Sequence, residues 1–238
     1  ADRSDTHKTS GGAAIDAGAS TPHLVLRSAG IAGMAFSLLF VVSLWLVSAR
    51  PPEGLDEIAF IDWYEANALG SVTVAALYVA PFAGIAFLWF IGLIRSRIGT
   101  REDQLFATVF LGSGLLFVAM YWAGAAQFAS LVAGNRFDAA PPLTPAALEA
   151  VRSSAFSFLF VLAARAAAVF VLVTSTIIWR SRVLPHVLAI VGYAVGLAML
   201  LSLSFLQWIL LLFPLWVLLV SAVTLVVEWR RHGSTGQP

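Results

Sequence analysis

The sequence predicts an all-α membrane protein, a bundle of six transmembrane helices whose N- and C-termini are both cytoplasmic. Of its 238 residues, 60% are hydrophobic and 11% are charged, and the mean hydropathy is +0.88. Soluble domains carry about a quarter charged residues. Six apolar stretches are long enough to cross a bilayer, which takes roughly 20 helical residues. They cover residues 29–49, 71–94, 104–133, 153–179, 184–203 and 206–228.

These stretches occupy one transmembrane domain, residues 28–229. Residues 1–27 begin with a run of small and polar residues, which predicts a disordered cytoplasmic tail. Residues 230–238 form a short cytoplasmic C-terminal tail. The last two stretches are the hardest to divide, because residues 187–227 contain no charge. This run is about twice the length of one crossing, and its polar residues at 202, 204 and 207 indicate a tight turn there.

The distribution of arginine and lysine predicts the orientation, because cytoplasmic loops carry the excess of these residues. With the N-terminus inside, three cationic residues fall in external segments, namely Arg50, Arg136 and Arg152. Ten fall in cytoplasmic segments: Arg3, Lys8, Arg27, Arg95, Arg97, Arg101, Arg180, Arg182, Arg230 and Arg231. A bias of ten to three favours six crossings over five or seven.

The first three stretches have recognisable ends. Trp45 and Trp89 lie near the ends of the first and second stretches, where tryptophan favours the membrane interface. Pro81 interrupts the backbone hydrogen bonds of the second stretch. Glu102 and Asp103 precede the third, where acidic residues complement the positive end of a helix dipole.

The last three stretches show capping and packing signals. Thr144 followed by Pro145 is a typical helix start, so the fourth helix is expected to begin outside the membrane and to continue into it. Gly192 and Gly196 form a small-xxx-small pair in the fifth stretch, which predicts close helix packing. Pro214 interrupts the sixth stretch.

Arg165 is the most informative residue, because it lies inside the fourth stretch and that stretch contains no acidic residue. Arginine does not lose its charge in proteins, and a charge at membrane depth indicates a functional position with a partner. Counting back from Trp179 places Arg165 about 9 Å below the external surface. One interpretation is that its side chain extends to external headgroups. The other is that it faces the bundle interior.

If Arg165 faces the interior, the sequence offers two sets of polar partners. Tyr121, Trp122 and Gln127 of the third stretch reach a similar depth and are expected to hydrogen-bond the guanidinium. Asp62 and Glu65 lie in the acidic segment between the first two stretches, and a helix there would place both on one face. We therefore expect a lid that carries one of these carboxylates to the guanidinium. The alternative is a solvated acidic loop with its aromatic residues at the interface.

Composition also disfavours several functions. The net charge of +1 provides no basic surface for nucleic acid. The chain has no cysteine, and none of its four histidines lies inside a predicted helix core, so we expect no cofactor and no metal. The paired aspartates, the HExxH zinc pair and the GxSG serine of intramembrane proteases are absent. Catalysis is therefore disfavoured, although a lipid-modifying enzyme stays as one alternative.

Two stretches carry a family resemblance: PFAGIAFLWFIGLIRSRIGTREDQLFATVFLGSGLLF (residues 81–117) and SRVLPHVLAIVGYAVGL (residues 181–197). They resemble uncharacterised bacterial polytopic membrane proteins of unknown function. The resemblance covers under half of the chain. It implies a multi-pass protein of a bacterial plasma membrane and supplies no activity.

The sequence thus predicts a non-enzymatic membrane protein with a polar site around Arg165 in the external leaflet. We expect this site to bind a lipid or a small acidic ligand, or to dock a partner subunit or a second copy of the chain. A small transporter or channel component is the main alternative. A transporter is expected to have a cavity along Arg165, whereas a docking protein is expected to have a packed interior.

Overall fold

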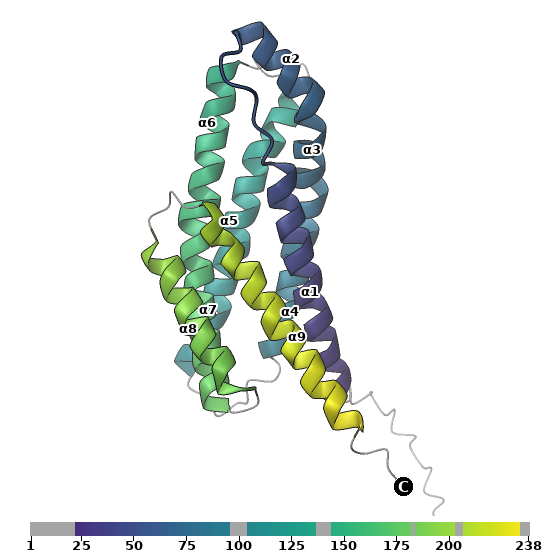
Figure 1. Cartoon of the computed structure of the whole chain (residues 1–238), viewed down its shortest axis with the longest axis vertical. Helices are drawn as coiled ribbons and strands as arrows, with labels where there is room; N and C mark the ends of the chain where they lie inside the picture. Colours follow the sequence, from purple (N-terminus) through teal and green to yellow (C-terminus); the bar gives the residue numbers. More distant parts are fainter. Residues whose placement is uncertain (1–21, 96–103, 137–143, 182–183, 203–206, 234–238) are drawn as a thin grey trace, which may run out of the picture.

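A computed structural model describes residues 22–95, 104–136, 144–181, 184–202 and 207–233 of the chain, and within these ranges the secondary structure is entirely helical (Figure 1). The first half contains α1 (Pro22–Leu46), α2 (Glu57–Asn67), α3 (Leu69–Val74), the π-helix η1 (Ala75–Val79), α4 (Ala80–Arg95) and α5 (Gln104–Arg136). The second half contains α6 (Pro145–Phe156), the π-helix η2 (Ser157–Ala163), α7 (Ala164–Ser181), α8 (His186–Leu201), the 3-10 helix η3 (Gln207–Leu211) and α9 (Leu212–Gly233). The predicted all-α class is confirmed.

Five helical segments in the described ranges are long and apolar enough to cross a membrane: Ser28–Leu46, Leu69–Arg95, Leu105–Ser130, Pro145–Ser181 and Trp208–Val227. The protein is therefore a multi-pass membrane protein. α8 is apolar but has only 16 residues. It is the element on which a count of five or six crossings depends.

Several boundaries differ from the predicted ones. The first helix begins at Pro22, inside the predicted tail, and the rest of that tail lies outside the described residues. Proline is well suited to the first turn of a helix, because its missing N–H would have no partner there. Thr144 caps α6 as predicted, since its hydroxyl accepts a bond of 3.2 Å from the Ala147 amide.

The two prolines inside apolar segments each follow an irregular turn. Pro81 comes just after η1, and Pro214 comes shortly after η3. Proline has no N–H to donate to the carbonyl four residues earlier. The backbone before it adopts a wider or tighter turn, as π and 3-10 segments commonly do at such points.

The interior of the bundle is filled by phenylalanine side chains. Phe36, Phe87, Phe117 and Phe213 come from α1, α4, α5 and α9, and all four are fully buried. Their ring centroids lie 4.6 to 5.9 Å apart, mostly in tilted or edge-to-face pairs, which are favourable arrangements for aromatic rings. Large rigid rings therefore occupy the centre of the bundle.

The last two helices pack on different partners. α8 packs mainly on α7, and α9 packs mainly on α1. Gly192 of α8 allows this approach, because a Cβ there would meet the hydroxyl of Ser175 and the indole of Trp216. Gly33 of α1 similarly faces Ser221 of α9. The predicted packing role of Gly192 is thus confirmed.

One end of the molecule projects beyond the rest. The continuous rod of α6, η2 and α7, Pro145–Ser181, has 37 residues and is about 55 Å long, whereas the hydrocarbon of a bilayer is about 30 Å thick. Figure 1 shows that α2, α3 and the adjoining parts of α5 and α6 extend past the start of α9 and the end of α8. We call this region, α2 and α3 with residues 125–136 and 145–157, the head.

Candidate functional site

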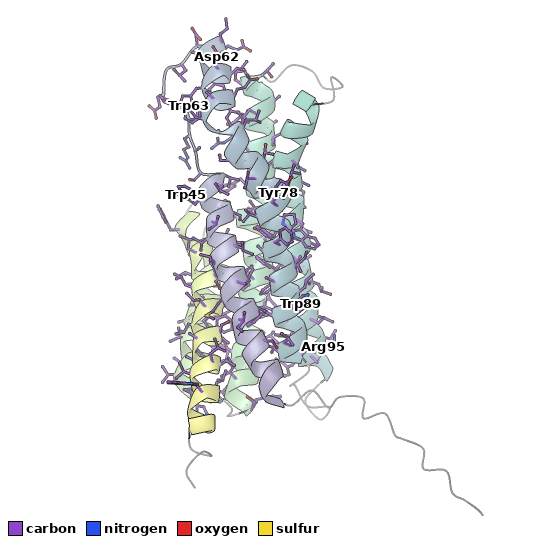
Figure 2. The ribbon with its side chains drawn as sticks, turned by 90° about the vertical axis from the view of Figure 1, so that its right-hand side faces the viewer. Trp45, Asp62, Trp63, Tyr78, Trp89 and Arg95 are labelled. Carbon is purple, nitrogen blue, oxygen red and sulfur yellow. The ribbon has the colours of Figure 1, made fainter. Side chains whose placement is uncertain are left out.

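Aromatic residues mark one level of the bundle, below the head. Trp45 lies 17 residues after Ser28 in α1, and Tyr78 lies 17 residues before Arg95. Both separations correspond to about 26 Å of helix. Figure 2 shows Trp45 and Tyr78 at similar heights, with Asp62 far above them. Trp45 is 73% exposed and Tyr78 is 60% exposed, and such residues favour the membrane interface.

Arg165 lies near the middle of the rod of α6, η2 and α7. It is 16 residues before Ser181, the end of α7, and Ser202 is 16 residues after His186, the start of α8. Each separation is about 24 Å. We call the level of Ser202 and the Arg165 guanidinium the boundary level, because the helix below it matches a thin hydrocarbon layer in length.

The guanidinium of Arg165 bonds to two backbone carbonyls. One terminal nitrogen donates to the Ser202 carbonyl oxygen at 2.8 Å. The other donates to the Phe160 carbonyl oxygen at 3.5 Å. Ser202 is the C-cap of α8, and Phe160 belongs to η2. Arg165 therefore joins α7 to the end of α8, where a cation is also favoured by the helix dipole.

The end of α8 is satisfied by the chain itself. The Ser202 amide donates to the Ala198 carbonyl at 3.0 Å, and the Ser202 hydroxyl donates to the Met199 carbonyl at 3.0 Å. Together with the bond from Arg165, these contacts satisfy carbonyls that a helix end leaves without intrahelical partners. α8 can therefore end at the boundary level without requiring water at each carbonyl.

Serine side chains accompany the π-helix next to Arg165. Ser153, Ser154 and Ser157 each donate a hydroxyl hydrogen bond to a carbonyl three or four residues earlier. Such bonds compete with the regular helical pattern and often bend helices. η2 begins at Ser157 and ends two residues before Arg165.

The expected polar partners from the third stretch do not contact Arg165. The Tyr121 hydroxyl lies 2.7 Å from the Ser43 hydroxyl, and Ser43 also donates to the Phe40 carbonyl. The Trp122 indole donates to the Ala80 carbonyl at 3.2 Å. The expected hydrogen bonds between the guanidinium and these two residues are therefore corrected to bonds with α1 and α4. For Trp122 the expectation also fails on chemistry, because an indole and a guanidinium are both donors.

Gln127 is also directed elsewhere, because its side-chain oxygen accepts a bond of 3.2 Å from the Ser154 hydroxyl of α6. Ser154 lies 11 residues before Arg165 on the rod, about 16 Å of helix, so Gln127 belongs to the head and not to the level of Arg165. Successive helical residues are rotated by about 100°, so Trp122 and Gln127 point about 100° and 240° away from Tyr121. One helix cannot direct all three side chains toward Arg165.

The expected carboxylate lid is corrected as well. Asp62 and Glu65 are exposed on α2, in the head, and the hydrogen bonds of Arg165 within the described residues go to carbonyls. The inward face of α2 is instead formed by Tyr64, which is 1% exposed and packs with Leu148 of α6. Bulk water solvates the two carboxylates at lower cost than burial would.

A second polar contact holds the head together. Arg152 of α6 donates to the Ala49 carbonyl at 3.4 Å, which ties α6 to the segment after α1. Burial raises the pKa of the Tyr64 phenol above 10.0, and the nearby positive charge of Arg152 partly lowers it. The neutral phenol is thus the form that the folded head favours.

Two hollows lie near these residues. A groove of about 310 Å³ in the head is lined by residues from the starts of α2 and α6: Leu55, Asp56, Glu57, Phe60, Thr144, Pro145 and Ala146. Asp56 already caps α2, since it accepts a bond of 2.8 Å from the Ala59 amide. A smaller cavity of about 20 Å³ lies beside Tyr121 and Ser43, which is enough for about one water molecule.

The sequence interpretation identified Arg165 but missed its partners. The contacted groups at Ser202 and Phe160 are main-chain carbonyls, which every residue has. One sequence feature did point to Ser202: the predicted turn at residues 202–207 places the end of a helix near the expected depth of Arg165. Helix ends carry free carbonyls. No comparable signal marks Phe160.

No protein-family model matches the chain, and comparisons with curated proteins and with solved structures find no match.

Proposed function

We propose that the protein is a non-catalytic, six-span protein of a bacterial plasma membrane that binds an anionic group through Arg165 at the external side. The supporting observation is the half-buried guanidinium at the boundary level, which donates to two carbonyls and has no carboxylate partner among the described residues. Carbonyl oxygens satisfy hydrogen-bond donors but leave a full positive charge. An anion at this position would therefore be strongly favoured.

Two features support six crossings. α8 and the segment that begins at η3 lie on either side of residues 202–206, and α8 reaches the boundary level despite its 16 residues. In Figure 1, α1 begins and α9 ends at the same end of the molecule, as an even number of crossings requires. The excess of arginine in segments at that end favours a cytoplasmic location for it.

The packed interior favours binding over transport. A transport pathway would need a cavity that reaches Arg165 from each side of the membrane in turn. The centre of the bundle below the boundary level is instead occupied by fully buried rings such as Phe87 and Phe117, in contact at 5.1 Å between centroids. Arg165 lies outside this aromatic core, on the rod of α6, η2 and α7.

The proposal can be tested by ligand-dependent thermal stability. We would purify the protein in a neutral detergent and measure its unfolding temperature with inorganic phosphate, hexanoate or dihexanoylphosphatidylglycerol added separately. At least one of these anions is expected to stabilise the wild type and to leave Arg165→Gln unaffected. Glutamine is uncharged but still offers an N–H to the Ser202 carbonyl.

Arg152→Gln is the matched control. It removes the same charge from the same rod, 13 residues earlier and about 20 Å away, and it is expected to keep the wild-type response. Equal responses of the wild type and Arg165→Gln to all three anions would contradict the proposed function.

A further inference from the structure

We propose that the anionic group bound by Arg165 is the phosphate of an anionic phospholipid, one whose headgroup carries no cation, and that this lipid approaches from within the external leaflet. This inference rests on the proposed function and narrows it to one source of anion. It follows from the surroundings of Arg165, its depth and its remaining hydrogen-bond donors.

The surroundings of Arg165 are those of a lipid-facing surface. Leu162 lies one helical turn before Arg165 and is 47% exposed, and Leu201, next to Ser202, is 77% exposed. In a membrane protein, large exposed aliphatic side chains at this depth face acyl chains. A lipid whose chains lie along Leu162 and Leu201 brings its headgroup to the guanidinium by lateral diffusion.

Approach from the aqueous side is less favourable. Next to Arg165 on the side of the head, the rod presents Phe160, whose ring stacks on that of Phe156 in the head with centroids 4.7 Å apart. Both rings are half-buried. A soluble anion would have to leave water and pass this apolar surface, at a large desolvation cost. An anion that is covalently attached to acyl chains is already at this depth.

The depth also suits a phosphate. Trp45 and Tyr78 mark the level at which aromatic side chains meet headgroups. The side chain of arginine is long and flexible enough to extend a few ångströms beyond its own Cα level. The Arg165 guanidinium reaches back along the rod to the Phe160 carbonyl, toward the head, and we therefore place it close to the layer in which lipid phosphates lie.

The donor count leaves room for such a ligand. A guanidinium has five N–H groups, and the contacts with Ser202 and Phe160 use two of them. Three remain, which is enough for a paired interaction with two phosphate oxygens. Paired, charge-assisted bonds of this kind are the strongest contacts that arginine makes, and the carbonyl bonds hold the guanidinium in place for them.

Photo-cross-linking with site mapping tests this inference. We would reconstitute the protein in phosphatidylcholine nanodiscs that contain a small fraction of diazirine-bearing phosphatidylglycerol, or of phosphatidylcholine with the same diazirine chain. After illumination, mass spectrometry of peptides would locate the cross-links. The choline cation of phosphatidylcholine neutralises its own phosphate, whereas phosphatidylglycerol keeps a net negative charge. We therefore expect phosphatidylglycerol to label the segments around Leu162 and Leu201 about tenfold more, as a charge-assisted bond stronger by about 1.5 kcal/mol implies.

Variants separate charge from structure. Arg165→Gln is expected to abolish the preference for phosphatidylglycerol at these two segments, and Arg165→Lys is expected to keep part of it. Arg152→Gln should behave as the wild type. Labelling by phosphatidylglycerol at other sites, such as the arginines at the opposite end of the bundle, is expected to be the same in all variants and serves as an internal reference.

The possible outcomes are distinct. Equal labelling of the Leu162 and Leu201 segments by both lipids in the wild type would overturn the inference, and this comparison needs no variant to fold. If hexanoate or inorganic phosphate nevertheless stabilises the wild type but not Arg165→Gln, the proposed function stands with a soluble acid or a partner's acidic group as its ligand. If neither experiment distinguishes Arg165, both proposals fail.

Discussion

A terminal nitrogen of Arg165 lies 2.8 Å from the carbonyl oxygen of Ser202, and this hydrogen bond joins the middle of a long helical rod to the end of a short helix. The bond gives the charged residue a structural role in addition to any ligand that it binds. A 16-residue helix can end at the boundary level because the arginine satisfies its last carbonyl. Structural and binding roles thus depend on the same side chain.

Replacement of Arg165 by leucine is expected to destabilise the protein. The Ser202 carbonyl would lose its donor at a depth with little water, which costs about 1–3 kcal/mol. Thermal unfolding of the purified protein, followed by tryptophan fluorescence, would measure the change. Ser202→Ala is the control, because it removes the hydroxyl bond to Met199 but keeps the carbonyl that Arg165 contacts. A larger loss in Ser202→Ala than in Arg165→Leu would argue against this role.

Tyr121→Phe tests the polar contact between α1 and α5. The Tyr121 hydroxyl contacts Ser43 at 2.7 Å, and the residue is 2% exposed. Loss of this bond is expected to reduce the free energy of unfolding by about 1 kcal/mol. Tyr78→Phe, which alters a tyrosine that is 60% exposed, should change stability much less. Equal effects of the two substitutions would show that the Ser43 contact contributes nothing specific.

Two glycines of α4 provide a matched pair. A Cβ at Gly84 would meet the indole nitrogen of Trp122, whereas a Cβ at Gly92 would meet nothing within 4 Å. Gly84→Ala is expected to displace the indole and break its bond to the Ala80 carbonyl, at a cost of about 1 kcal/mol or more. Gly92→Ala should be neutral or stabilising by up to about 1 kcal/mol, because alanine favours helix. Unfolding temperatures in the reverse order would contradict the packing of α4 on α5.

From the raised pKa of the Tyr64 phenol we expect the stability of the protein to depend on pH in the alkaline range. Burial raises the pKa of its phenol above 10.0 in the folded protein, so the folded state holds this proton more tightly than the unfolded state does. The resulting stabilisation is complete at pH values below the pKa of the phenol in the unfolded protein. It is lost as the pH rises through the pKa of the phenol in the folded protein. Unfolding of the wild type and Tyr64→Phe would be compared from about pH 8 to about pH 11.

We expect the difference in stability between the wild type and Tyr64→Phe to be constant at the lower pH values and to shift against the wild type at the highest. Comparison of the two proteins cancels the titration of other groups. A difference that does not change with pH would mean that the Tyr64 environment is the same in the folded and unfolded states.

The features that depend on hydrophobic length could be predicted from the sequence. The apolar stretches, the cap at Thr144 and the close packing at Gly192 all follow from local patterns, and the structure contains them. The importance of Arg165 could also be predicted, because a charge in a long apolar run is anomalous regardless of its neighbours.

Features that depend on the rotation of a helix could not be predicted in the same way. Tyr121 contacts Ser43 of α1 and Trp122 contacts Ala80 of α4, and a predicted depth does not fix which neighbouring helix a side chain faces. The face of α2 was assigned from Asp62 and Glu65, yet Tyr64 is the residue that packs inward. On a short amphipathic segment with apolar residues on several sides, tertiary contacts decide which face is buried.

The position of Arg165 at the external boundary of the bilayer, with the head outside it, can be tested directly by single-cysteine labelling. The chain contains no cysteine, so each introduced thiol is the sole reactive site. Suitable exposed positions along the rod are Glu149, Ser153, Ser157 and Leu162. A membrane-impermeant maleimide would be added to intact cells, with Asp62→Cys as the reference for a fully external residue.

The Arg165 guanidinium reaches the Phe160 carbonyl, so we place the start of the hydrocarbon between Ser157 and Leu162. We therefore expect cysteines at 149, 153 and 157 to react like the reference and the cysteine at 162 to be protected. Protection that already begins at Glu149 or Ser153 would place Arg165 deep in the membrane and would contradict the boundary level. If all of the introduced cysteines reacted with the maleimide only in inverted vesicles, the proposed orientation would be contradicted and the head would lie on the cytoplasmic side.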